Sequence, residues 1–258
     1  MKVVILAGGA GTRISEETSL RPKPMVEIGG KPILWHIMKH YANYGHNDFI
    51  ICLGFKGYYI KEYFANYFLH QTDVTINLKE NKFTFHNSNS EDWNVTLVDT
   101  GLNTQTGCRI KKVEKYIDGP FMLTYGDGVS DINLDTLLKS HKSHGGIGTM
   151  TSVQPEGRFG NLEISGSNQV SSFIEKPKEG GTWINGGFFV FEKAFLNYLT
   201  LEEDLILERR PLEMLTQDKQ LFAYKHTGFW KCMDTLRDKN QLESMWQTNN
   251  PPWKTWKD

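Results

Sequence analysis

The stretch KVVILAGGAGTR, residues 2–13, decides the fold class of this 258-residue chain. Its first half is a short apolar run rich in β-branched residues, and its second half is rich in glycine. Such a run followed by glycines predicts a buried strand that ends in a tight loop. Loops at strand ends are the usual ligand sites of α/β sheets.

The segments that follow alternate between helix and strand signals. Residues 33–44 come directly after Pro32 and end at Gly45, which predicts a helix with ordinary start and stop signals. Residues 48–53 predict a second buried strand, and residues 58–68 a second helix. This order implies a parallel sheet with crossover helices.

The second half of the chain adds strands of a different texture. Residues 121–125 and 147–153 predict buried strands around a helix at 134–144. Shorter strand signals, separated by Gly, Ser and Asn, follow at 161–164, 170–175, 184–191 and 221–226. We therefore predict an α/β fold, doubly wound around a mixed, mostly parallel sheet.

Two segments stand apart from this core. Residues 72–94 contain two strand signals separated by Glu80-Asn81, which predicts an inserted β-hairpin arm. Residues 234–258 predict a C-terminal helix and a tail with two tryptophans. We expect residues 1–258 to form a single domain that carries both additions.

Bulk properties exclude several function classes. The formal net charge is -1, so no basic excess points to nucleic acid or to a membrane surface. No run approaches the ~18 apolar residues of a membrane helix. The three cysteines are far apart and odd in number, which suits reduced thiols rather than disulfides. We expect a cytoplasmic protein.

The first loop has the chemistry of a triphosphate site. Its glycines let backbone N–H groups approach an anion closely, and Thr12 adds a hydroxyl. Arg13 and Lys23 add fixed positive charge. A P-loop would end in Gly-Lys-Ser/Thr, and a dinucleotide fingerprint would carry a third glycine where Ile14 stands. The alternative is a glycine-rich turn without a ligand.

Two aspartates are candidates for a magnesium site. Asp127 lies between two glycines at the end of a predicted strand, and magnesium takes few protein carboxylates. Asp234 is the best candidate for a second ligand. Taken alone, Gly-Asp-Gly is more often a turn, and Asp234 could simply cap the last helix.

Two further sets of polar residues are consistent with substrate binding. Glu175, Lys176 and Asn185 offer the groups that a sugar phosphate requires, although a surface ion pair and a β-bulge explain them equally well. Thr104 and Arg109 flank a glycine turn that could contact a base or a phosphate, or could cap a helix.

Taken together, these strings resemble the sugar-nucleotide pyrophosphorylase family of nucleotidyltransferases. The resemblance is strongest to its glucose-1-phosphate cytidylyltransferase branch. The matching strings run in family order over nearly the whole chain: LAGGAGTR, RPKPMVEIGGKPILWHIM, VTLVDTG, TGCR, TYGDG, GRFG, EKP, INGGFFV and MDTLRD. Cys108 and Ile14 depart from the residues expected at their positions, Gly and Leu.

The resemblance implies a Rossmann-like nucleotidyltransferase core and assigns roles to individual residues. Arg13 and Lys23 would act in catalysis, Asp127 and Asp234 would hold Mg²⁺, and Glu175, Lys176 and Asn185 would bind the sugar phosphate. The implied nucleotide-binding residues are Leu6, Ala7, Gly8, Gly9, Gly11, Thr12, Arg13, Thr104, Arg109 and Gly126.

The implied reaction transfers CMP from CTP to α-D-glucose 1-phosphate and yields CDP-glucose and pyrophosphate, for bacterial dideoxyhexose and O-antigen lipopolysaccharide biosynthesis. Transfer of a cytidylyl, thymidylyl or uridylyl group to another phosphorylated acceptor is the nearest alternative. A non-catalytic nucleotide-binding protein of the same fold is an alternative of another class. We also expect a homo-oligomer with the arm and the tail at subunit contacts, since both would otherwise be partly wet. The alternative is that the arm and the tail each fold back on their own domain.

Overall fold

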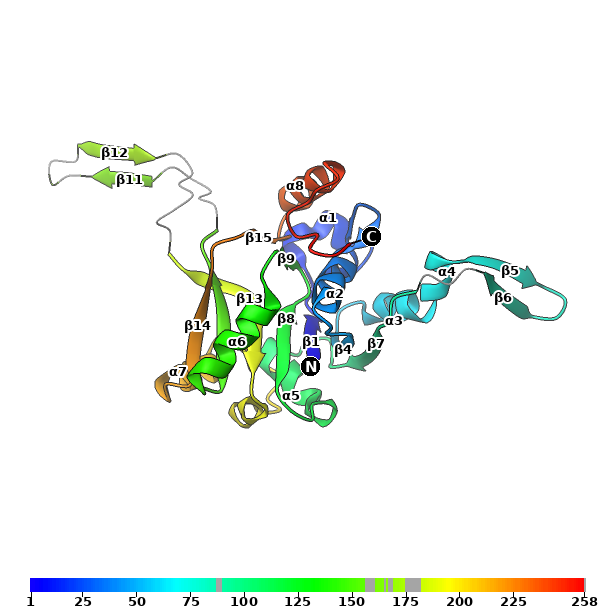
Figure 1. Ribbon diagram of the computed structural model, residues 1–258, viewed down its shortest axis with the longest axis horizontal. Coiled ribbons are helices and arrows are strands. Elements are labelled where there is room, and N and C mark those ends of the chain that lie inside the picture. Colours follow the sequence, from blue (N-terminus) through cyan, green and yellow to red (C-terminus); the bar gives the residue numbers. More distant parts are fainter. Residues whose placement is uncertain (87–89, 156–160, 165, 167–168, 175–181, 258) are drawn as a thin grey trace.

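A seven-stranded sheet forms the centre of the computed structural model, which describes residues 1–86, 90–155, 161–164, 166, 169–174 and 182–257 (Figure 1). The strand order is β14-β10-β13-β8-β1-β4-β7. Strand β13 runs antiparallel to both of its neighbours, and the other neighbouring strands are parallel. The predicted mixed, mostly parallel sheet is therefore confirmed. The strands of the sheet are β1 (Lys2–Ala7), β4 (Asp48–Leu53), β7 (Asn94–Asp99), β8 (Phe121–Tyr125), β10 (Gly148–Val153), β13 (Ile184–Phe191) and β14 (Leu221–His226).

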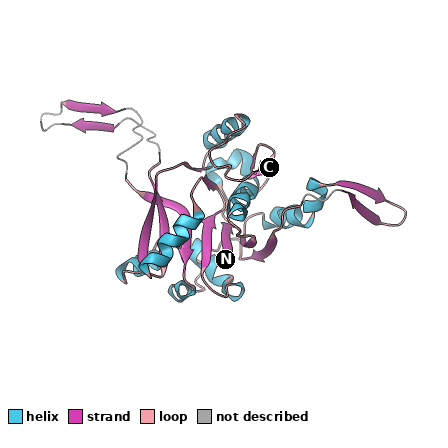
Figure 2. Cartoon of the chain, in the orientation of Figure 1, coloured by secondary structure: helices cyan, strands magenta, loops and turns pink. Residues whose placement is uncertain are grey.

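Helices cover both faces of this sheet (Figure 2). The α-helices are α1 (Ser15–Thr18), α2 (Ile33–Asn43), α3 (Gly57–Ala65), α4 (Tyr67–Gln71), α5 (Thr106–Lys112), α6 (Leu134–His144), α7 (Arg210–Gln217) and α8 (Leu236–Gln247). Short 3₁₀ turns are η1 (Thr12–Ile14), η2 (Lys23–Met25), η3 (Glu114–Tyr116) and η4 (Lys193–Tyr198). Four two-stranded pairs complete the fold: β2 (Glu27–Ile28) with β3 (Lys31–Pro32), β5 (Asp73–Asn77) with β6 (Lys82–His86), β9 (Gly128–Ser130) with β15 (Trp230–Cys232), and β11 (Asn161–Ile164) with β12 (Val170–Ile174).

The apolar run of β1 explains why two layers of helices can pack here. Val3 and Ile5 belong to one buried cluster, together with residues of α2 and α8. Val4 and Leu6 belong to a second cluster, with residues of α5 and α7. Since successive strand residues point to opposite faces, an unbroken apolar run places a core on each face. The strand is thereby fixed in the middle of the sheet, and its glycine loop is fixed at the carboxyl end of the strand.

The stretch between β4 and α5 differs in part from the prediction. Strands β5 and β6 pair antiparallel as the expected hairpin, and Figure 1 shows them projecting from the body beyond α4. Strand β7, however, joins the main sheet at its edge, parallel to β4, and the sequence prediction did not include it. Its residues are mostly half-buried, so it lacks the strong apolar signal of the central strands.

The C-terminal tail packs against its own chain. Trp253 is 1% exposed and Trp256 7% exposed, and both rings lie near the ring of His36 on α2. The backbone carbonyl of Thr255 also accepts a hydrogen bond from Asn43. The expectation that these tryptophans need a partner subunit is therefore wrong, because α2 and the end of α8 already cover them.

Strands β11 and β12 pair with each other, and neither takes part in the main sheet.

Of the helices in the described ranges, none is both long and apolar enough to cross a bilayer.

Candidate active site

A cavity of about 480 Å³ lies at the carboxyl ends of β1 and β8. The carboxyl ends of parallel strands meet at one edge of a sheet, so loops far apart in sequence converge there. Most of its lining consists of residues predicted from the sequence: Leu6, Ala7, Gly8, Gly9, Gly11, Thr12, Arg13, Lys23, Thr104, Arg109, Gly126, Asp127 and Asp234. All the predicted nucleotide, catalytic and metal residues thus lie around one space.

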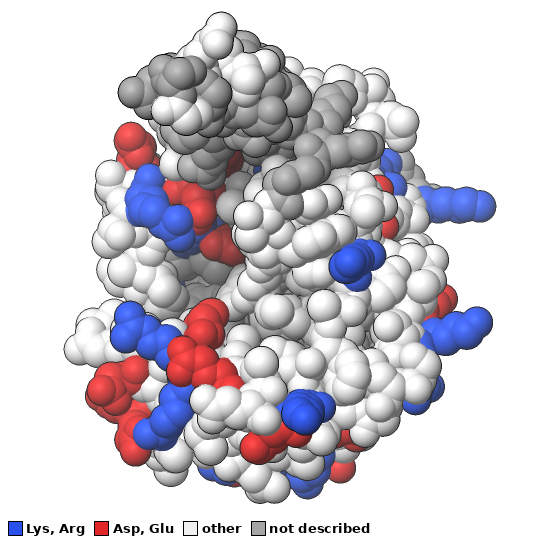
Figure 3. Space-filling model, turned by 90° about the vertical axis from the view of Figure 1, so that its left-hand side faces the viewer, with Lys and Arg blue, Asp and Glu red and all other residues white. Residues whose placement is uncertain are grey.

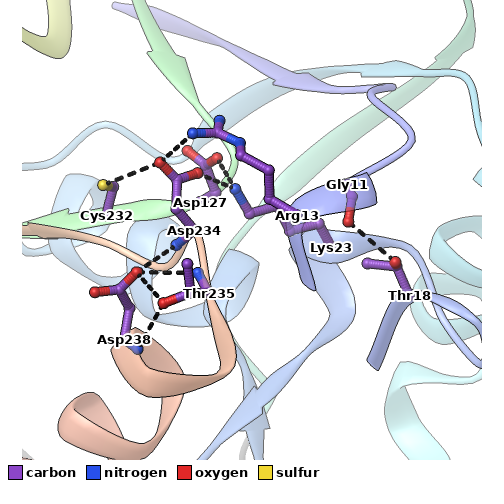
Figure 4. Close-up of polar contacts among 9 residues, drawn as sticks. All are labelled: Gly11, Arg13, Thr18, Lys23, Asp127, Cys232, Asp234, Thr235 and Asp238. Carbon is purple, nitrogen blue, oxygen red and sulfur yellow. Dashed lines mark hydrogen bonds and ion pairs between the residues drawn. The ribbon is translucent and has the colours of Figure 1, made fainter. Parts of the chain in front are cut away.

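The glycine loop after β1 is packed too closely for side chains at two positions. A Cβ on Gly8 would lie 2.3 Å from a guanidinium nitrogen of Arg109. Gly11 has a φ of +62°, and a Cβ there would lie 2.8 Å from the side chain of Thr18. Thr18 also donates a hydrogen bond to the Gly11 carbonyl, 3.1 Å away (Figure 4). Glycine is needed here because the backbone itself forms the wall of the cavity.

Lys23 holds together the two candidate metal ligands. Its ammonium nitrogen lies 2.6 Å from Oδ2 of Asp127 and 2.7 Å from Oδ1 of Asp234 (Figure 4). Arg13 reaches the other oxygen of Asp234 at 2.8 Å, although the Arg13 side chain is 71% exposed. The two carboxylates therefore converge on one position that already accommodates a cation.

Strand pairing explains how residues 127 and 234 meet. Gly128 on β9 is paired with Cys232 on β15, and the Met233 N–H donates to the Asp127 carbonyl at 2.8 Å. This short antiparallel pair places the two aspartates side by side, although they lie far apart in sequence.

Asp234 is not the cap of the last helix. The N-cap of α8 is Thr235, which forms a reciprocal capping box with Asp238. Asp238 also accepts a hydrogen bond from the backbone N–H of Asp234. The capping explanation for Asp234 is therefore wrong, and its side chain points to Lys23 instead (Figure 4).

Charges in the cavity shift the ionisation of these groups. Burial alone would lower the pKa of Lys23, but Asp127 and Asp234 raise it above its ordinary value. Burial would likewise raise the pKa of Asp234, but the Lys23 ammonium and Arg13 hold it below its ordinary value. Lys23 and Asp234 are accordingly both charged near neutral pH.

Arg109 lines the same cavity but has different partners. Its side chain is buried, and burial lowers the pKa of the guanidinium. It donates to one hydroxyl and to four backbone carbonyls, namely Thr100 Oγ1 and the carbonyls of Gly8, Leu53, Gly101 and Leu102. These acceptors lie at or just after the carboxyl ends of β1, β4 and β7. Arg109 thus holds three neighbouring strand-end loops together, and its predicted contact with a nucleotide stays a prediction.

Thr104 is also buried at the cavity wall. Its hydroxyl accepts a hydrogen bond from the Lys112 ammonium at 3.1 Å. A second hydrogen-bonding direction of the hydroxyl could still serve a ligand, and its predicted nucleotide role likewise stays a prediction.

A second, smaller cavity of about 40 Å³ adjoins the first. Asp127, Tyr125 and Cys232 line both, and Asn185 lines the second. Asn185 Nδ2 donates to the Tyr125 hydroxyl at 3.1 Å. Glu175 and Lys176 lie outside the described residues, so of the three predicted sugar-phosphate residues only Asn185 can be placed.

Sequence reasoning missed several residues of this region. Tyr125, Gln105 and Cys232 line the large cavity, and Glu208 contacts both Tyr125 and Thr106. Tyr125 directly precedes the Gly-Asp-Gly string and could have been proposed on that ground. Nothing local to Glu208 marks it, because its partners come from distant segments.

No group of three or more His, Cys, Asp or Glu side chains suited to a metal occurs among the described residues. A pair of carboxylates is nevertheless what magnesium commonly takes from a protein, since water and phosphate oxygens complete its coordination shell. On the face shown in Figure 3, acidic and basic side chains lie together around a hollow, and neither sign covers a broad area.

The fold and cavity define an α/β protein with a cavity lined by glycines and charged side chains at the carboxyl ends of its strands. Comparison with known proteins narrows this class: a family model described as nucleotidyl transferase matches residues 2–250. The chain belongs to the nucleotidyl transferase family.

Individual relatives cover nearly the whole chain. A glucose-1-phosphate cytidylyltransferase from Salmonella typhi is 55% identical over 99% of this chain and 100% of its own length. A mannose-1-phosphate guanyltransferase from Saccharomyces cerevisiae is 28% identical over 94% of this chain and 63% of its own length. The crystal structure of HddC from Yersinia pseudotuberculosis shares the fold, with a TM-score of 0.67, 24% identity, and coverage of 95% of this chain and 99% of that chain.

Proposed function

We propose that this protein transfers CMP from CTP to α-D-glucose 1-phosphate, with CDP-glucose and pyrophosphate as products. The 55% identical relative from Salmonella typhi is a glucose-1-phosphate cytidylyltransferase, which supports this choice of substrates. The observation that carries the proposal is the position of Lys23. Its ammonium pairs with Asp127, which lines both the large and the small cavity, and with Asp234. A nucleotide in the large cavity and a sugar phosphate near the small one would meet at this point.

The chemistry needs no general base. A sugar phosphate is mostly a dianion near neutral pH, since the second pKa of a phosphate monoester is about 6. One of its oxygens attacks the α-phosphorus of CTP, a P–O bond forms, and the bond to pyrophosphate breaks. Lys23 and Arg13 carry the positive charge that reduces repulsion between the two anions and stabilises the leaving group.

A covalent route through Cys232 is disfavoured. Its thiol lines both cavities and lies 3.6 Å from Asp234. Burial, with the neighbouring carboxylates, raises the pKa of Cys232 to about 11. A thiol that stays protonated at neutral pH is a poor nucleophile, so direct transfer fits the site better.

We infer that Asp127 and Asp234 hold Mg²⁺. Their oxygens lie 2.6 and 2.7 Å from the same ammonium, so the pair already surrounds a cation position. A bound Mg²⁺ would supply neutralisation of phosphate charge in the transition state. Lys23 and Arg13 would then be free to contact phosphate oxygens, because the metal would take over their role of balancing the two carboxylates.

A substrate panel tests the proposed reaction. Purified protein is incubated with each of CTP, dTTP, UTP and GTP, combined with glucose 1-phosphate or mannose 1-phosphate, and pyrophosphate release is measured with and without Mg²⁺. CTP with glucose 1-phosphate should be fastest, and EDTA should abolish release. A faster rate with another pair would favour a different nucleotidyltransferase activity. No release with any pair, together with tight CTP binding, would favour a non-catalytic nucleotide-binding protein.

We further infer that residues 1–258 form one domain, with residues 72–94 as an arm and residues 234–258 as a C-terminal helix and tail. We also infer that the arm joins subunits of a homo-oligomer. One face of the arm is apolar: Val74 is paired with Phe85 and Ile76 with Phe83. Phe83 is 51% exposed, and Phe85 and Ile76 are each 46% exposed. An isolated two-stranded hairpin is marginally stable in water, so a second copy covering this face would stabilise it.

Light scattering tests the assembly. The wild-type chain has a mass of 29.6 kDa and should sediment and scatter as a multiple of it. Replacing both Phe83 and Phe85 by Thr keeps strand propensity and removes the apolar face, so the assembly should dissociate. Lys82→Thr, on the same strand but the other face, is the control. A monomeric wild type would contradict the proposal.

The three free cysteines fit a cytoplasmic location, which cell fractionation can check.

A further inference from the structure

We propose that Glu208 is a positioning residue that holds Tyr125 between the nucleotide side and the sugar-phosphate side of the site. The proposal rests on the proposed function, since it concerns the alignment of those two substrates. It assigns a role to a carboxylate that lies outside both cavities and to a tyrosine that lines both of them.

The Glu208 carboxylate has two hydrogen-bond partners from separate parts of the fold. Its Oε1 accepts from the hydroxyl of Tyr125, at the end of β8. Its Oε2 accepts from Thr106 Oγ1, at the start of α5, at 2.9 Å. Thr106 Oγ1 in turn accepts from the backbone N–H of Leu207 at 2.8 Å. A carboxylate bound on both sides in this way is fixed in position and fixes its partners.

Tyr125 connects Glu208 to the second cavity through hydrogen bonds of its hydroxyl. Its hydroxyl donates to Glu208 and accepts from Asn185 Nδ2 at 3.1 Å, while Asn185 Oδ1 accepts from the Gly187 N–H at 2.8 Å. Asn185 Nδ2 can only donate and the Glu208 carboxylate accepts, so the direction of each hydrogen bond is set: Asn185 to Tyr125, and Tyr125 to Glu208.

The tyrosine ring is also held by packing. Gly187 has a φ of +78°, and a Cβ built there would lie 2.5 Å from Cδ2 of Tyr125. The ring therefore lies directly on the backbone of β13. A ring clamped at its face by β13 and at its hydroxyl by Glu208 has little freedom to turn into the space between the two cavities.

The segment that carries Glu208 is anchored to the nucleotide-side loop. The backbone N–H of Gln105 donates to the carbonyl of Glu203 at 2.7 Å, and that of Gly107 donates to the carbonyl of Leu205 at 2.9 Å. Gln105 and Thr106 line the large cavity. The position of Glu208 is thus fixed relative to the nucleotide-side loop. Its hydrogen bond to Tyr125, which in turn contacts Asn185, fixes the position of Asn185 relative to the same loop.

The expected consequence is an effect that differs between the two substrates. Without the Tyr125–Glu208 contact, Asn185 loses an acceptor of fixed position, whereas the glycine loop and Lys23 keep their contacts. We expect the KM for glucose 1-phosphate to rise by about 10-fold, which corresponds to the loss of one hydrogen bond to a charged group. The KM for CTP should stay within about twofold, and kcat should fall because the substrates are less well aligned.

The experiment compares Tyr125→Phe, Glu208→Ala and the double variant. Because the two residues act through one contact, the double variant should be no worse than the more impaired single variant. Glu208→Gln keeps an acceptor for Tyr125 and should recover most of the activity that Glu208→Ala loses. Glu202→Ala is the matched control, since its carboxylate lies on the same segment in an exposed pair with Arg210 and should change neither KM.

Several outcomes would overturn the proposal: wild-type kinetics for Tyr125→Phe, equal changes in both KM values, or effects that multiply in the double variant. If Glu208→Ala does not fold, the KM values of Tyr125→Phe alone decide the question. The wild type is first assayed on the substrate panel. If another nucleotide and sugar phosphate prove to be the substrates, the variants are compared on that pair, so a wrong substrate and a wrong role for Glu208 can be told apart.

Discussion

Lys23 and Arg109 line the same cavity, but different groups contact their positive charges. The Lys23 ammonium lies between two carboxylates, those of Asp127 and Asp234. The Arg109 guanidinium is buried and donates to carbonyls and one hydroxyl, with no carboxylate in ion-pair contact among the described residues. Both residues were predicted from the sequence as ligand contacts, from their charge beside glycine-rich loops and from the family resemblance.

The difference separates an exchangeable cation from a structural one. Another cation can replace the Lys23 ammonium between two carboxylates, because carboxylate oxygens are also ligands of metal ions such as Mg²⁺. No metal can replace the fork of N–H donors that Arg109 offers to several carbonyls at once. We therefore expect Lys23 to move during the reaction cycle and Arg109 to keep the loops in place.

The largest expected effect is on turnover, in Asp127→Asn. The change keeps the shape of the side chain and removes the charge that both Lys23 and a metal require. We expect kcat to fall by about 100-fold or more, as for loss of a transition-state charge contact, while CTP still binds. The measurement is kcat across a Mg²⁺ titration, with CTP affinity by calorimetry. A kcat near that of the wild type at any Mg²⁺ concentration would show that Asp127 is not a metal ligand.

The next effect is on stability, in Arg109→Met compared with Lys23→Met. Both changes remove a cation and keep an unbranched side chain. Arg109→Met leaves several buried carbonyls without a donor, which should lower the free energy of unfolding by about 3 kcal/mol or more. Lys23→Met removes no backbone contact and should cost less. Urea unfolding with EDTA present measures both. An equal loss in the two variants would remove the distinction between the two cations.

These two cations also show how far the sequence alone could lead. The apolar run 2–7 and the glycines after it predicted β1 and its loop correctly, because both signals are local. The convergence of Asp127 and Asp234 was also predicted, first from the need of magnesium for a second carboxylate and then from family resemblance. The partners of Arg109 could not be predicted, since backbone carbonyls have no side-chain signature and those of Leu53 and Gly8 lie far away in sequence.

The same limit applies elsewhere in the molecule. Strand β7 was missed because an edge strand is only half-buried and its apolar signal is weak. Glu208 was missed because both of its contacts are long-range. The tail tryptophans were read as exposed because nothing near them in sequence indicates that α2 provides a surface to cover them.

A smaller effect concerns metal affinity in Lys23→Met without nucleotide. If the Lys23 ammonium and the metal share one position, the ammonium competes with the metal, and its removal should tighten Mn²⁺ binding by about 10-fold, equivalent to about 1.4 kcal/mol. Electron paramagnetic resonance of free Mn²⁺ measures this directly. The affinity should also become less dependent on added CTP, because phosphate no longer has to draw Lys23 away. An unchanged Mn²⁺ affinity would mean that the two cations occupy different positions.

The smallest effect should come from Arg13→Met, measured in the same Mn²⁺ assay. Arg13 also pairs with Asp234, at 2.8 Å, but its side chain is 71% exposed, whereas that of Lys23 is 10% exposed. Water screens an exposed ion pair, and such pairs contribute about 1 kcal/mol or less. Arg13 also contacts only one of the two aspartates, so it does not lie at the position where both carboxylates converge. Mn²⁺ affinity should therefore change by less than about threefold. The kcat/KM for CTP should still fall, since the charge of Arg13 remains available to a phosphate once the nucleotide is bound. A change in Mn²⁺ affinity as large as that of Lys23→Met would indicate that total charge around Asp234, and not occupancy of one shared position, governs metal binding.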